Sequence, residues 1–212
     1  QNGASVIVGK PKNKISNLDY VETQDHREAL GKLASKFYGE PTKHLKIIGV
    51  TGTKGKTTTS MMIQHILNKM GAKTGLVSTI SARIGDKEID TGSHVTSPGV
   101  LDLYRLFRLM VDEKCKYAVI EVSSHGIAQK RIAGVNFEVA VLTHIAPEHL
   151  DYHKTFKEYK RVKMSFVNSA LHKVISQTKT SRKTFPGEFN NLNADSAVKV
   201  ASILGFDKKD IE

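Results

Sequence analysis

One stretch in the first third of the chain, KIIGVTGTKGKTTTSMMIQHIL, restricts the possible folds more than any other. Its apolar start at 46–51 predicts a buried strand, and a loop rich in Gly, Thr and Lys follows. Residues 57–70 then predict a helix that Gly71 ends. A strand, a glycine-rich loop and a helix in this order are the setting of a phosphate-binding loop. The stretch therefore predicts an α/β chain that holds a phosphate beyond the end of a strand.

Strands and helices alternate along the rest of the chain. Continuous apolar runs predict further strands, helical patterns follow them, and Gly85 and Asp86 mark the turn of a hairpin. Apolar strands of this kind are typical of a sheet covered on both faces. The pattern predicts a doubly wound, mostly parallel α/β sheet. The expected strands are 3–8, 74–79, 117–122 and 138–145, the hairpin is 82–91, and the other helices are 24–39, 98–114, 155–171 and 192–204.

Composition argues against several classes of protein. No apolar run approaches the roughly 20 residues of a membrane span, and the N-terminus lacks the pattern of a signal peptide. The net charge is +11, but the lysines and arginines are scattered along the chain and form no basic motif interleaved with aromatic residues. We therefore expect neither a nucleic-acid nor a membrane partner. A single cysteine, Cys115, suits a reducing compartment. We expect a cytoplasmic monomer whose chain, without an initiator methionine, begins inside a longer protein.

The phosphate loop itself predicts ATP with magnesium. Its glycines let the backbone approach phosphate oxygens, its second lysine reaches the β- and γ-phosphates, and the first threonine of the helix ligates magnesium. The strict motif fails by one residue, because Val50 stands where glycine is required and Gly49 lies one position earlier. The alternative is a glycine-rich helix entry without a ligand. The residues expected to bind ATP are Gly52, Thr53, Lys54, Gly55, Lys56, Thr57 and Thr58.

Further motifs follow the loop in order. They are HVTSPGVLDLYRLF at 94–107, EVSSHGIAQKR at 121–131, HLDYHKTFKEYKRVKMSF at 149–166 and FPGEFNNLNADSA at 185–197. With GVTGTKGKTT at 49–58, they resemble the Mur ligases, and among them the MurE type. The loop alone also admits folylpolyglutamate synthases and cyanophycin synthetases. The resemblance covers about 46–205, and the preceding piece resembles the end of that family's uridine-binding domain.

The resemblance implies an activity and a domain plan. MurE-type ligases use ATP to add the third stem-peptide amino acid to UDP-N-acetylmuramoyl-dipeptide through an acyl-phosphate, in peptidoglycan biosynthesis. Residues 1–44 are then a remnant of the N-terminal domain and 45–212 the central ATP-binding domain. The C-terminal ligase domain is absent. The added amino acid stays open between meso-diaminopimelate and lysine.

The resemblance also implies a metal site and a catalytic set. Glu121 ends a strand, where α/β sheets place ligands, and the family uses it to coordinate magnesium. His149 matches a second metal residue, an assignment that depends on the family because magnesium prefers oxygen. Lys163 matches a lysine carried as a carbamate, which requires a neutral amine of lowered pKa. The expected catalytic residues are Lys56, Glu121 and Lys163, and the expected metal ligands are Thr57, Glu121, His149 and the Lys163 carbamate.

Two polar groups match the family's substrate contacts. The first suits sugar, peptide and anionic groups of the muramoyl-peptide, since it offers hydroxyls, an amide and a guanidinium. It consists of Thr96, Ser97, Ser123, Gln129 and Arg131. The second, Asn190 and Asn193, matches asparagines near the adenine, because a carboxamide can read a donor and an acceptor on a base edge. Each has a simpler alternative, a surface polar group for the first and a helix N-cap for the asparagines.

The sequence also departs from the family. In THIAPEHLDYH, His144 stands where Asn is common and Pro147-Glu148 where Arg-Asp is common, so we expect an altered loop beside the metal. The stretch 167–184 is shorter than in the family, which predicts either a natural deletion or missing residues. Two other functions stay open. One is a ligase of the folylpolyglutamate synthase type, and the other is a non-catalytic module that holds a nucleotide or muramoyl-peptide.

Overall fold

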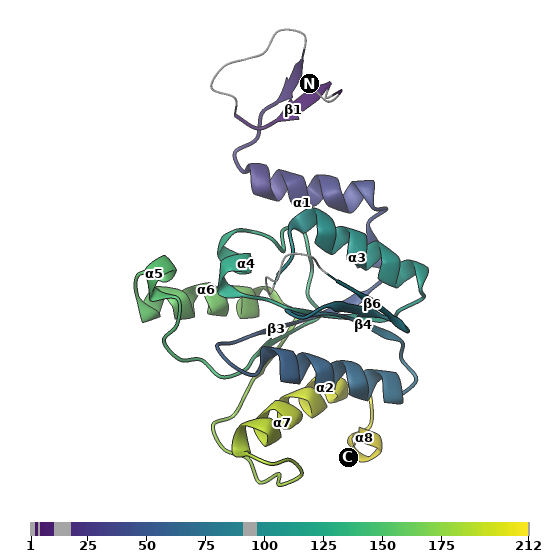
Figure 1. The fold of residues 1–212 in the computed structure, drawn as a ribbon, viewed down its shortest axis with the longest axis vertical. Coiled ribbons are helices and arrows are strands. Elements are labelled where there is room, and N and C mark those ends of the chain that lie inside the picture. Colours follow the sequence, from purple (N-terminus) through teal and green to yellow (C-terminus); the bar gives the residue numbers. More distant parts are fainter. Residues whose placement is uncertain (1–2, 4, 11–17, 91–96, 212) are drawn as a thin grey trace.

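A seven-stranded sheet forms the centre of the molecule and carries helices on both faces (Figure 1). The computed structural model describes residues 3, 5–10, 18–90 and 97–211. The strand order is β6-β5-β4-β7-β3-β8-β9, in which β4, β7, β3, β8 and β9 run parallel and the β5–β6 hairpin antiparallel. This confirms the doubly wound α/β prediction. The strands are β3 (Lys46–Thr51), β4 (Thr74–Val77), β5 (Ala82–Ile84), β6 (Lys87–Ile89), β7 (Tyr117–Glu121), β8 (Val139–Leu142) and β9 (His172–Ile175).

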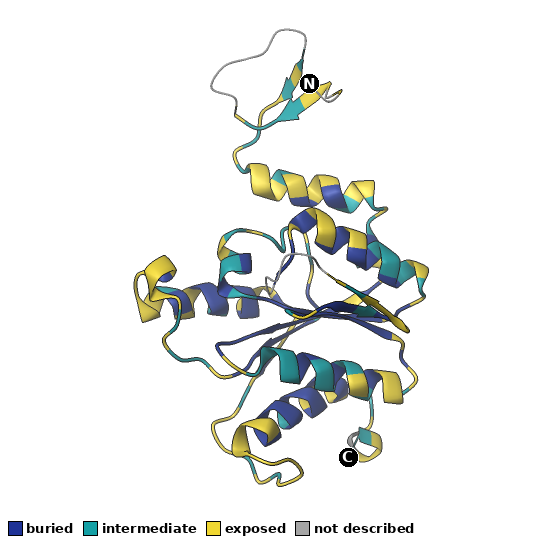
Figure 2. Cartoon of the chain, viewed as in Figure 1, coloured by how far each residue is buried: buried dark blue, intermediate teal, exposed yellow. Residues whose placement is uncertain are grey.

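Each face of the sheet has its own apolar core. On one face, α2 (Lys56–Lys69) and α7 (Glu188–Ile203) pack together over Val119 and its neighbours. On the other face, α3 (Val100–Asp112) and α6 (Phe156–Ser169) cover Ala118 and Ile120, and α1 (His26–Phe37) packs on α3. Successive residues of β7 thus point to opposite cores, as strand geometry requires. Figure 2 shows the central strands buried between the two helix layers.

The N-terminal segment joins this body through one helix. Short parallel strands, β1 (Val6–Val8) and β2 (Asp19–Val21), form a separate pair beyond α1 (Figure 1). α1 begins after Asp25, whose carboxylate accepts from the backbone of the first turn, and it packs against α3. Over residues 5–10, 18–90 and 97–211, no helix has the length and apolar character of a membrane span.

Several elements differ from the sequence-based expectations. Helix α3 begins at Val100 rather than at Pro98, and α7 begins at Glu188 rather than near 192. The short stretch 167–184 contains β9, which joins the sheet beside β8 and had not been expected. Five more short elements lay outside the prediction, because brief segments carry little periodicity. They are β2, η1 (Pro41–Lys43), α4 (Ser124–Ala128), α5 (Leu150–His153) and α8 (Lys208–Ile211).

Gly49 is required by close packing in the middle of β3, so Gly49→Ala should destabilise the fold. A Cβ there would lie 2.5 Å from Cζ of Phe166 and 2.8 Å from Cε1 of Phe137. These rings already pack edge to face, with centroids 4.9 Å apart, so neither can move freely. We expect a loss of about 1–3 kcal/mol in the free energy of unfolding, measured by urea titration.

The matched control is Gly75→Ala in β4, where the added methyl group meets the side chain of Met110. A thioether chain repacks more easily than two locked rings, so the control should lose less stability. Equal losses for the two variants would contradict the packing argument.

Candidate functional site

The phosphate loop lies where β3 ends and α2 begins, at the carboxyl edge of the sheet. Gly55 precedes the helix with φ 89°, a left-handed conformation that favours glycine. The carboxamide of Asn193 in α7 lies against it, because a Cβ on Gly55 would be 2.6 Å from Oδ1 of Asn193. The backbone amides of the first turn of α2 follow Gly55 directly, and a helix N-terminus of this kind is a common anion-binding site.

Hydrogen bonds to the segment that follows β8 hold the phosphate loop in place. The Thr53 amide donates to the carbonyl of His144 at 2.7 Å, and the Thr53 hydroxyl donates to the carbonyl of Ala146 at 3.0 Å. The hydroxyl of Thr143 donates to the carbonyl of Lys54 at 2.7 Å. These bonds join the loop to the segment that follows β8. The shape of the loop is therefore set by tertiary contacts as well as by its own glycines.

Two lysines from distant parts of the chain meet at one carbonyl of the loop. Nζ of Lys56 donates to the carbonyl of Gly52 at 3.0 Å, and Nζ of Lys163 in α6 donates to the same carbonyl at 2.9 Å. Burial, partly offset by the charges of Glu121 and Glu148, lowers the pKa of Lys56. Two like charges this close disfavour each other unless an anion lies between them or one amine is neutral.

Lys163 is the more perturbed of the two. Its side chain is 1% exposed and lies over the ring of Tyr159, with Nζ 4.8 Å from the centroid. Burial, together with the charge of Lys56, lowers its pKa from 10.5 to about 7, while Glu148 acts in the opposite direction. A substantial fraction of this amine is therefore neutral near pH 7. That is the property which the sequence-based carbamate assignment requires.

Glu121 lies buried at the end of β7, beside the start of α2. Its Oε2 accepts from the hydroxyls of Thr57 and Thr79, both at 3.1 Å, and its Oε1 accepts from the Thr79 amide at 3.1 Å. The carboxylate is 2% exposed. The structure thus brings together the predicted pair Thr57 and Glu121, both of which offer oxygen atoms.

His149 lies within a group of aromatic rings that includes His125 and Tyr159. It precedes α5 with φ 54° and is half exposed. Its ring packs edge to face on His125, with centroids 4.7 Å apart, and lies 6.4 Å from the ring of Tyr159. Tyr159 thus lies near both His149 and Lys163.

These residues fit a magnesium ion held partly by phosphates. Within the described residues, no group of three or more His, Cys, Asp or Glu side chains could hold a metal ion alone. Magnesium in nucleotide sites takes one or two protein oxygens and fills its shell with phosphates and water. Thr57 and Glu121 meet that need, and a carbamate on Lys163 would add oxygen donors.

The predicted muramoyl-peptide residues form a connected polar group beside Glu121. The hydroxyls of Ser97 and Ser123 lie 3.2 Å apart, and Ser97 also donates to the carbonyl of Glu121 at 3.3 Å. Arg131 donates to the carbonyl of Ser97 at 2.7 Å and to Oε1 of Gln129 at 2.9 Å. The fifth predicted residue of this group, Thr96, lies outside the described residues.

A pocket lies between the loop and α7. Its volume is about 310 Å³, and its walls bring together the predicted Lys54, Gly55, Thr58, Asn190 and Asn193. His144 and Phe189 complete the lining. The departure His144 thus faces this pocket, whereas it had been expected to alter the loop beside the metal. The pocket places the two asparagines next to the helix end that would hold the phosphates.

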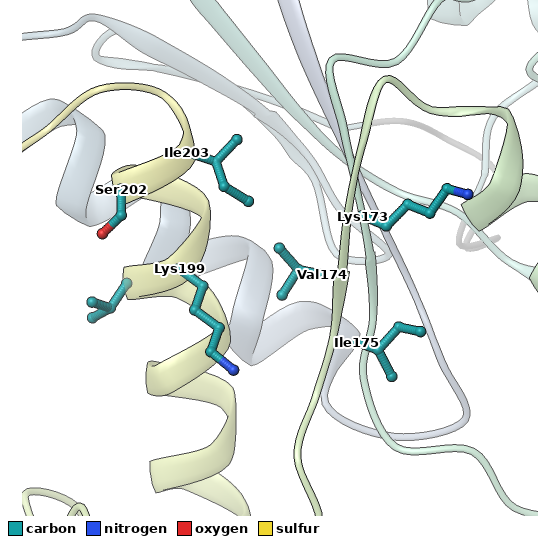
Figure 3. Close-up of a pocket in the computed structure, with 7 residues that line it drawn as sticks. Lys173, Val174, Ile175, Lys199, Ser202 and Ile203 are labelled. Carbon is teal, nitrogen blue, oxygen red and sulfur yellow. The ribbon is translucent and has the colours of Figure 1, made fainter.

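A larger cavity, of about 490 Å³, opens between β9 and α7, away from the loop (Figure 3). Val174 of the strand faces Lys199 and Ile203 of the helix, while Lys173 extends to the other side of the strand (Figure 3). The predicted site residues do not line this cavity. Size alone therefore does not identify the functional site of this chain.

Two functional candidates escaped the sequence analysis. Thr79 holds Glu121 through its amide and its hydroxyl, and Tyr159 contacts both Thr53 and Lys163. The first had a usable signal, because Thr79 follows β4 and the carboxyl ends of parallel strands meet at one edge. The second did also, because Tyr159 precedes Lys163 by four residues on one helix and shares its face.

Lys163→Met is expected to change how stability depends on pH. The pKa of Lys163 is about 7 in the folded chain and near 10.5 when unfolded. Between these values the unfolded chain binds more protons at this position, so the stability of the wild-type protein rises with pH. Methionine does not titrate, so the variant should lack this rise.

The measurement is urea unfolding of both proteins from about pH 6 to about pH 9.5. Buffers free of carbon dioxide keep the amine unmodified. The difference in stability between the two proteins should favour the variant most at the lowest pH and shrink as the pH rises. A constant difference across this range would show that Lys163 keeps an ordinary pKa.

Comparisons with known proteins agree with this geometry. The family described as "Mur ligase middle domain" matches residues 50–203. The UDP-N-acetylmuramoyl-L-alanyl-D-glutamate--2,6-diaminopimelate ligase of Clostridium botulinum (strain ATCC 19397 / Type A) is 45% identical over 181 residues, or 82% of this chain. The same-named protein of Phocaeicola vulgatus is 43% identical over 168 residues, or 78% of this chain.

A solved structure of a protein with this name superimposes with a TM-score of 0.82 at 22% identity. It covers 99% of this chain and 54% of the other, and at that identity it supports the fold alone. The chain spans 37% of the Clostridium relative and 34% of the Phocaeicola relative.

Proposed function

The chain belongs to the Mur ligase family, whose middle domain it contains, and on that premise we propose that it is the ATP-binding part of a ligase. The proposed reaction adds the third amino acid to UDP-N-acetylmuramoyl-dipeptide in peptidoglycan synthesis. The relatives are named for 2,6-diaminopimelate, which makes it the first candidate for the added amino acid. One observation carries the proposal. Lys56 and the buried Lys163 both donate to the carbonyl of Gly52 in the phosphate loop, and the hydroxyl of Thr57, just after this loop, donates to Glu121.

The first proposed step joins the substrate carboxylate to phosphate. A carboxylate oxygen attacks the γ-phosphorus of ATP, an O–P bond forms, and the bond to the β-phosphate oxygen breaks to release ADP. Negative charge spreads over the transferring group, so positioned cations and amide donors lower the barrier. Lys56 and the first turn of α2 supply them here, and magnesium, when bound, neutralises the phosphates.

The second step forms the amide. The amine of the incoming amino acid attacks the acyl carbon, phosphate leaves, and the amine loses a proton. Ser97, Ser123, Gln129 and Arg131 are proposed to hold the muramoyl-peptide so that its carboxylate faces the loop. Their mutual hydrogen bonds and the contact of Ser97 with the backbone of Glu121 support that placement.

Lys163 is proposed to carry a carbamate in the active protein. The neutral amine attacks carbon dioxide, an N–C bond forms, and one N–H proton passes to solvent. The product exchanges a cation for an anion beside Lys56 and so removes the repulsion between the two lysines. Together with Thr57, Glu121 and His149, it is proposed to serve the magnesium site.

The domain plan remains a proposal as well. Residues 1–44 are proposed to end an N-terminal uridine-binding domain, and 45–212 to form the central domain. A folylpolyglutamate synthase activity is the weaker candidate. A structure titled as a mutant of L. casei FPGS superimposes at a TM-score of 0.61 with 16% identity, which supports only a shared fold.

The test uses the protein as its source cells make it. Its intact mass is compared with 23.4 kDa, and phosphate release from ATP is measured with UDP-N-acetylmuramoyl-dipeptide and either diaminopimelate or lysine. The ligase proposal expects a larger mass and phosphate release that needs both substrates. Release that needs neither substrate, or release only with a folate, would overturn it.

A further inference from the structure

One buried side chain of α6 reaches the phosphate loop from the opposite face of the sheet. Helix α2, which follows the loop, packs in one apolar core, whereas α6 packs in the other. Tyr159, near the start of α6, is 0% exposed, and its hydroxyl lies 2.9 Å from the hydroxyl of Thr53 in the loop. The two residues are 106 positions apart in the sequence, so only the folded domain brings them together.

The hydrogen bonds around Thr53 make the tyrosine the donor. The hydroxyl of Thr53 donates its one proton to the carbonyl of Ala146 at 3.0 Å, and the amide of Ala146 donates to the same hydroxyl oxygen at 3.0 Å. A hydroxyl oxygen can donate once and accept twice. The second acceptor position of Thr53 therefore receives the phenol proton of Tyr159.

The same tyrosine also supports Lys163. Residues four apart on a helix share one face, and Nζ of Lys163 lies 4.8 Å from the centre of the Tyr159 ring. This amine donates to the carbonyl of Gly52 at 2.9 Å. Two adjacent loop residues, Gly52 and Thr53, are thus held by two side chains from one face of α6. Such a pair of contacts fixes the orientation of the peptide between the loop residues as well as its position.

The orientation of that peptide determines where the amine of Lys56 lies. Nζ of Lys56 donates to the carbonyl of Gly52 at 3.0 Å and to the carbonyl of Thr53 at 3.2 Å. The proposed phosphoryl transfer needs this amine at the transferring group, and a displacement of about 1 Å in such a site can cost about a hundredfold in rate. A contact that keeps both carbonyls in place therefore acts on the reaction through Lys56.

We propose that Tyr159 is a positioning residue for phosphoryl transfer, and that its hydroxyl acts through Thr53 to keep the amine of Lys56 aligned with the transferring phosphate. The proposal rests on the proposed ATP-dependent function and adds a residue that acts through the loop rather than on the substrate. A tyrosine that only filled the core would change stability when altered. The proposed role instead predicts a loss of rate with little loss of nucleotide affinity.

The test uses Tyr159→Phe, which removes the hydroxyl and keeps the ring beside Lys163. Phosphate release from ATP is measured with UDP-N-acetylmuramoyl-dipeptide and diaminopimelate. We expect kcat to fall about tenfold, because Lys56 is less well aligned. The KM for ATP should change by no more than about twofold, because the backbone amides at the start of α2 still bind the phosphates.

Tyr104→Phe in α3 is the matched control. Tyr104 is also 0% exposed, and its hydroxyl donates to the carbonyl of Ala133 at 3.2 Å rather than to the loop. The control loses a comparable hydrogen bond, so urea unfolding should show a similar loss of stability for the two variants. Its kcat and KM should nevertheless stay within about twofold of the wild-type values, since neither loop carbonyl depends on it.

A double-mutant cycle tests the route through the loop. Thr53→Val removes the hydroxyl that receives the phenol proton and keeps the branched shape of the side chain. In that background Tyr159→Phe should lower kcat by less than about twofold, because the contact is already lost. In a Thr53→Ser background, which keeps the hydroxyl, the loss of about tenfold should remain. An equal loss in the valine and serine backgrounds would overturn the route through Thr53.

The outcomes separate this inference from the function on which it rests. If phosphate release needs both substrates and Tyr159→Phe leaves kcat unchanged, the ligase function stands and the inference is wrong. If Tyr159→Phe and Tyr104→Phe lower kcat equally, the loss follows stability, and the inference is also wrong. If the wild-type protein releases no phosphate with both substrates, the proposed function fails and this inference fails with it.

Discussion

Lys163→Ala is expected to lower the ligation rate of the full-length protein by at least about a hundredfold, and formate or acetate is expected to restore part of it. The loss follows from removing a proposed magnesium-side anion at a site where charge is stabilised, an effect of roughly 10²–10³ for one such group. Restoration follows from burial, because truncating a side chain that is 1% exposed leaves a space beside Gly52. A short carboxylate can enter this space and present the oxygens that the carbamate supplied.

The controls for this experiment use charge and shape. Chloride at the same ionic strength should not restore activity, and Lys163→Met, which fills the space, should not respond to formate. The magnesium concentration that gives half the maximal rate should fall as formate is added. A Lys163→Ala protein with wild-type activity, or one that chloride restores equally, would contradict the carbamate proposal.

Lys56→Ala is expected to remove most ATP-dependent phosphate release from the full-length protein. Lys56 is the cation nearest the start of α2 in the proposed phosphate site, and its Nζ already lies within 3.0 Å of a loop carbonyl. Losing one preorganised donor to a transferring phosphoryl group costs about 10²–10³ in rate. Phosphate release is measured with saturating substrates, so that chemistry is separated from weaker binding.

Lys69→Ala at the other end of α2 provides the matched control, because it removes the same charge from the same helix far from the loop. It should leave the rate unchanged within about twofold. The unfolding midpoints of the two variants should be compared as well, since burial of Lys56 costs desolvation and its loss need not destabilise the fold. Equal rates for the two variants would show that the loop does not hold the transferring phosphate.

Much of the fold followed from the sequence. The strand 46–51 is found with the expected bounds, and the helix after the loop begins one residue earlier than predicted, at Lys56. Both were predictable because a six-residue apolar run and a helical pattern give strong local signals. The strand at 172–175 gave no such signal. It is short, mostly exposed and begins with His and Lys, so only its pairing with β8 defines it.

The candidate site was predictable in its residues and not in its contacts. Motifs indicated Lys56 and Lys163 separately, yet no pattern shows that both amines reach the carbonyl of Gly52. The pKa of Lys163 likewise depends on packing around α6, which a linear sequence does not describe. His144 shows the same limit. Its neighbours in the sequence indicated the metal side, whereas the register of the loop against β8 places it beside Phe189.

The attachment of the phosphate loop to the segment after β8 has a consequence for synthesis on the ribosome. The partners of Thr53 and Lys54 lie 89 to 106 residues further along the chain. While the ribosome is still translating that later segment, β3 and α2 can have emerged, but the loop between them lacks its outside supports. A nascent chain that stops before Thr143 should therefore hold a nucleotide poorly even if its first helices have formed. Nucleotide binding would then mark the moment at which the middle of this domain is complete.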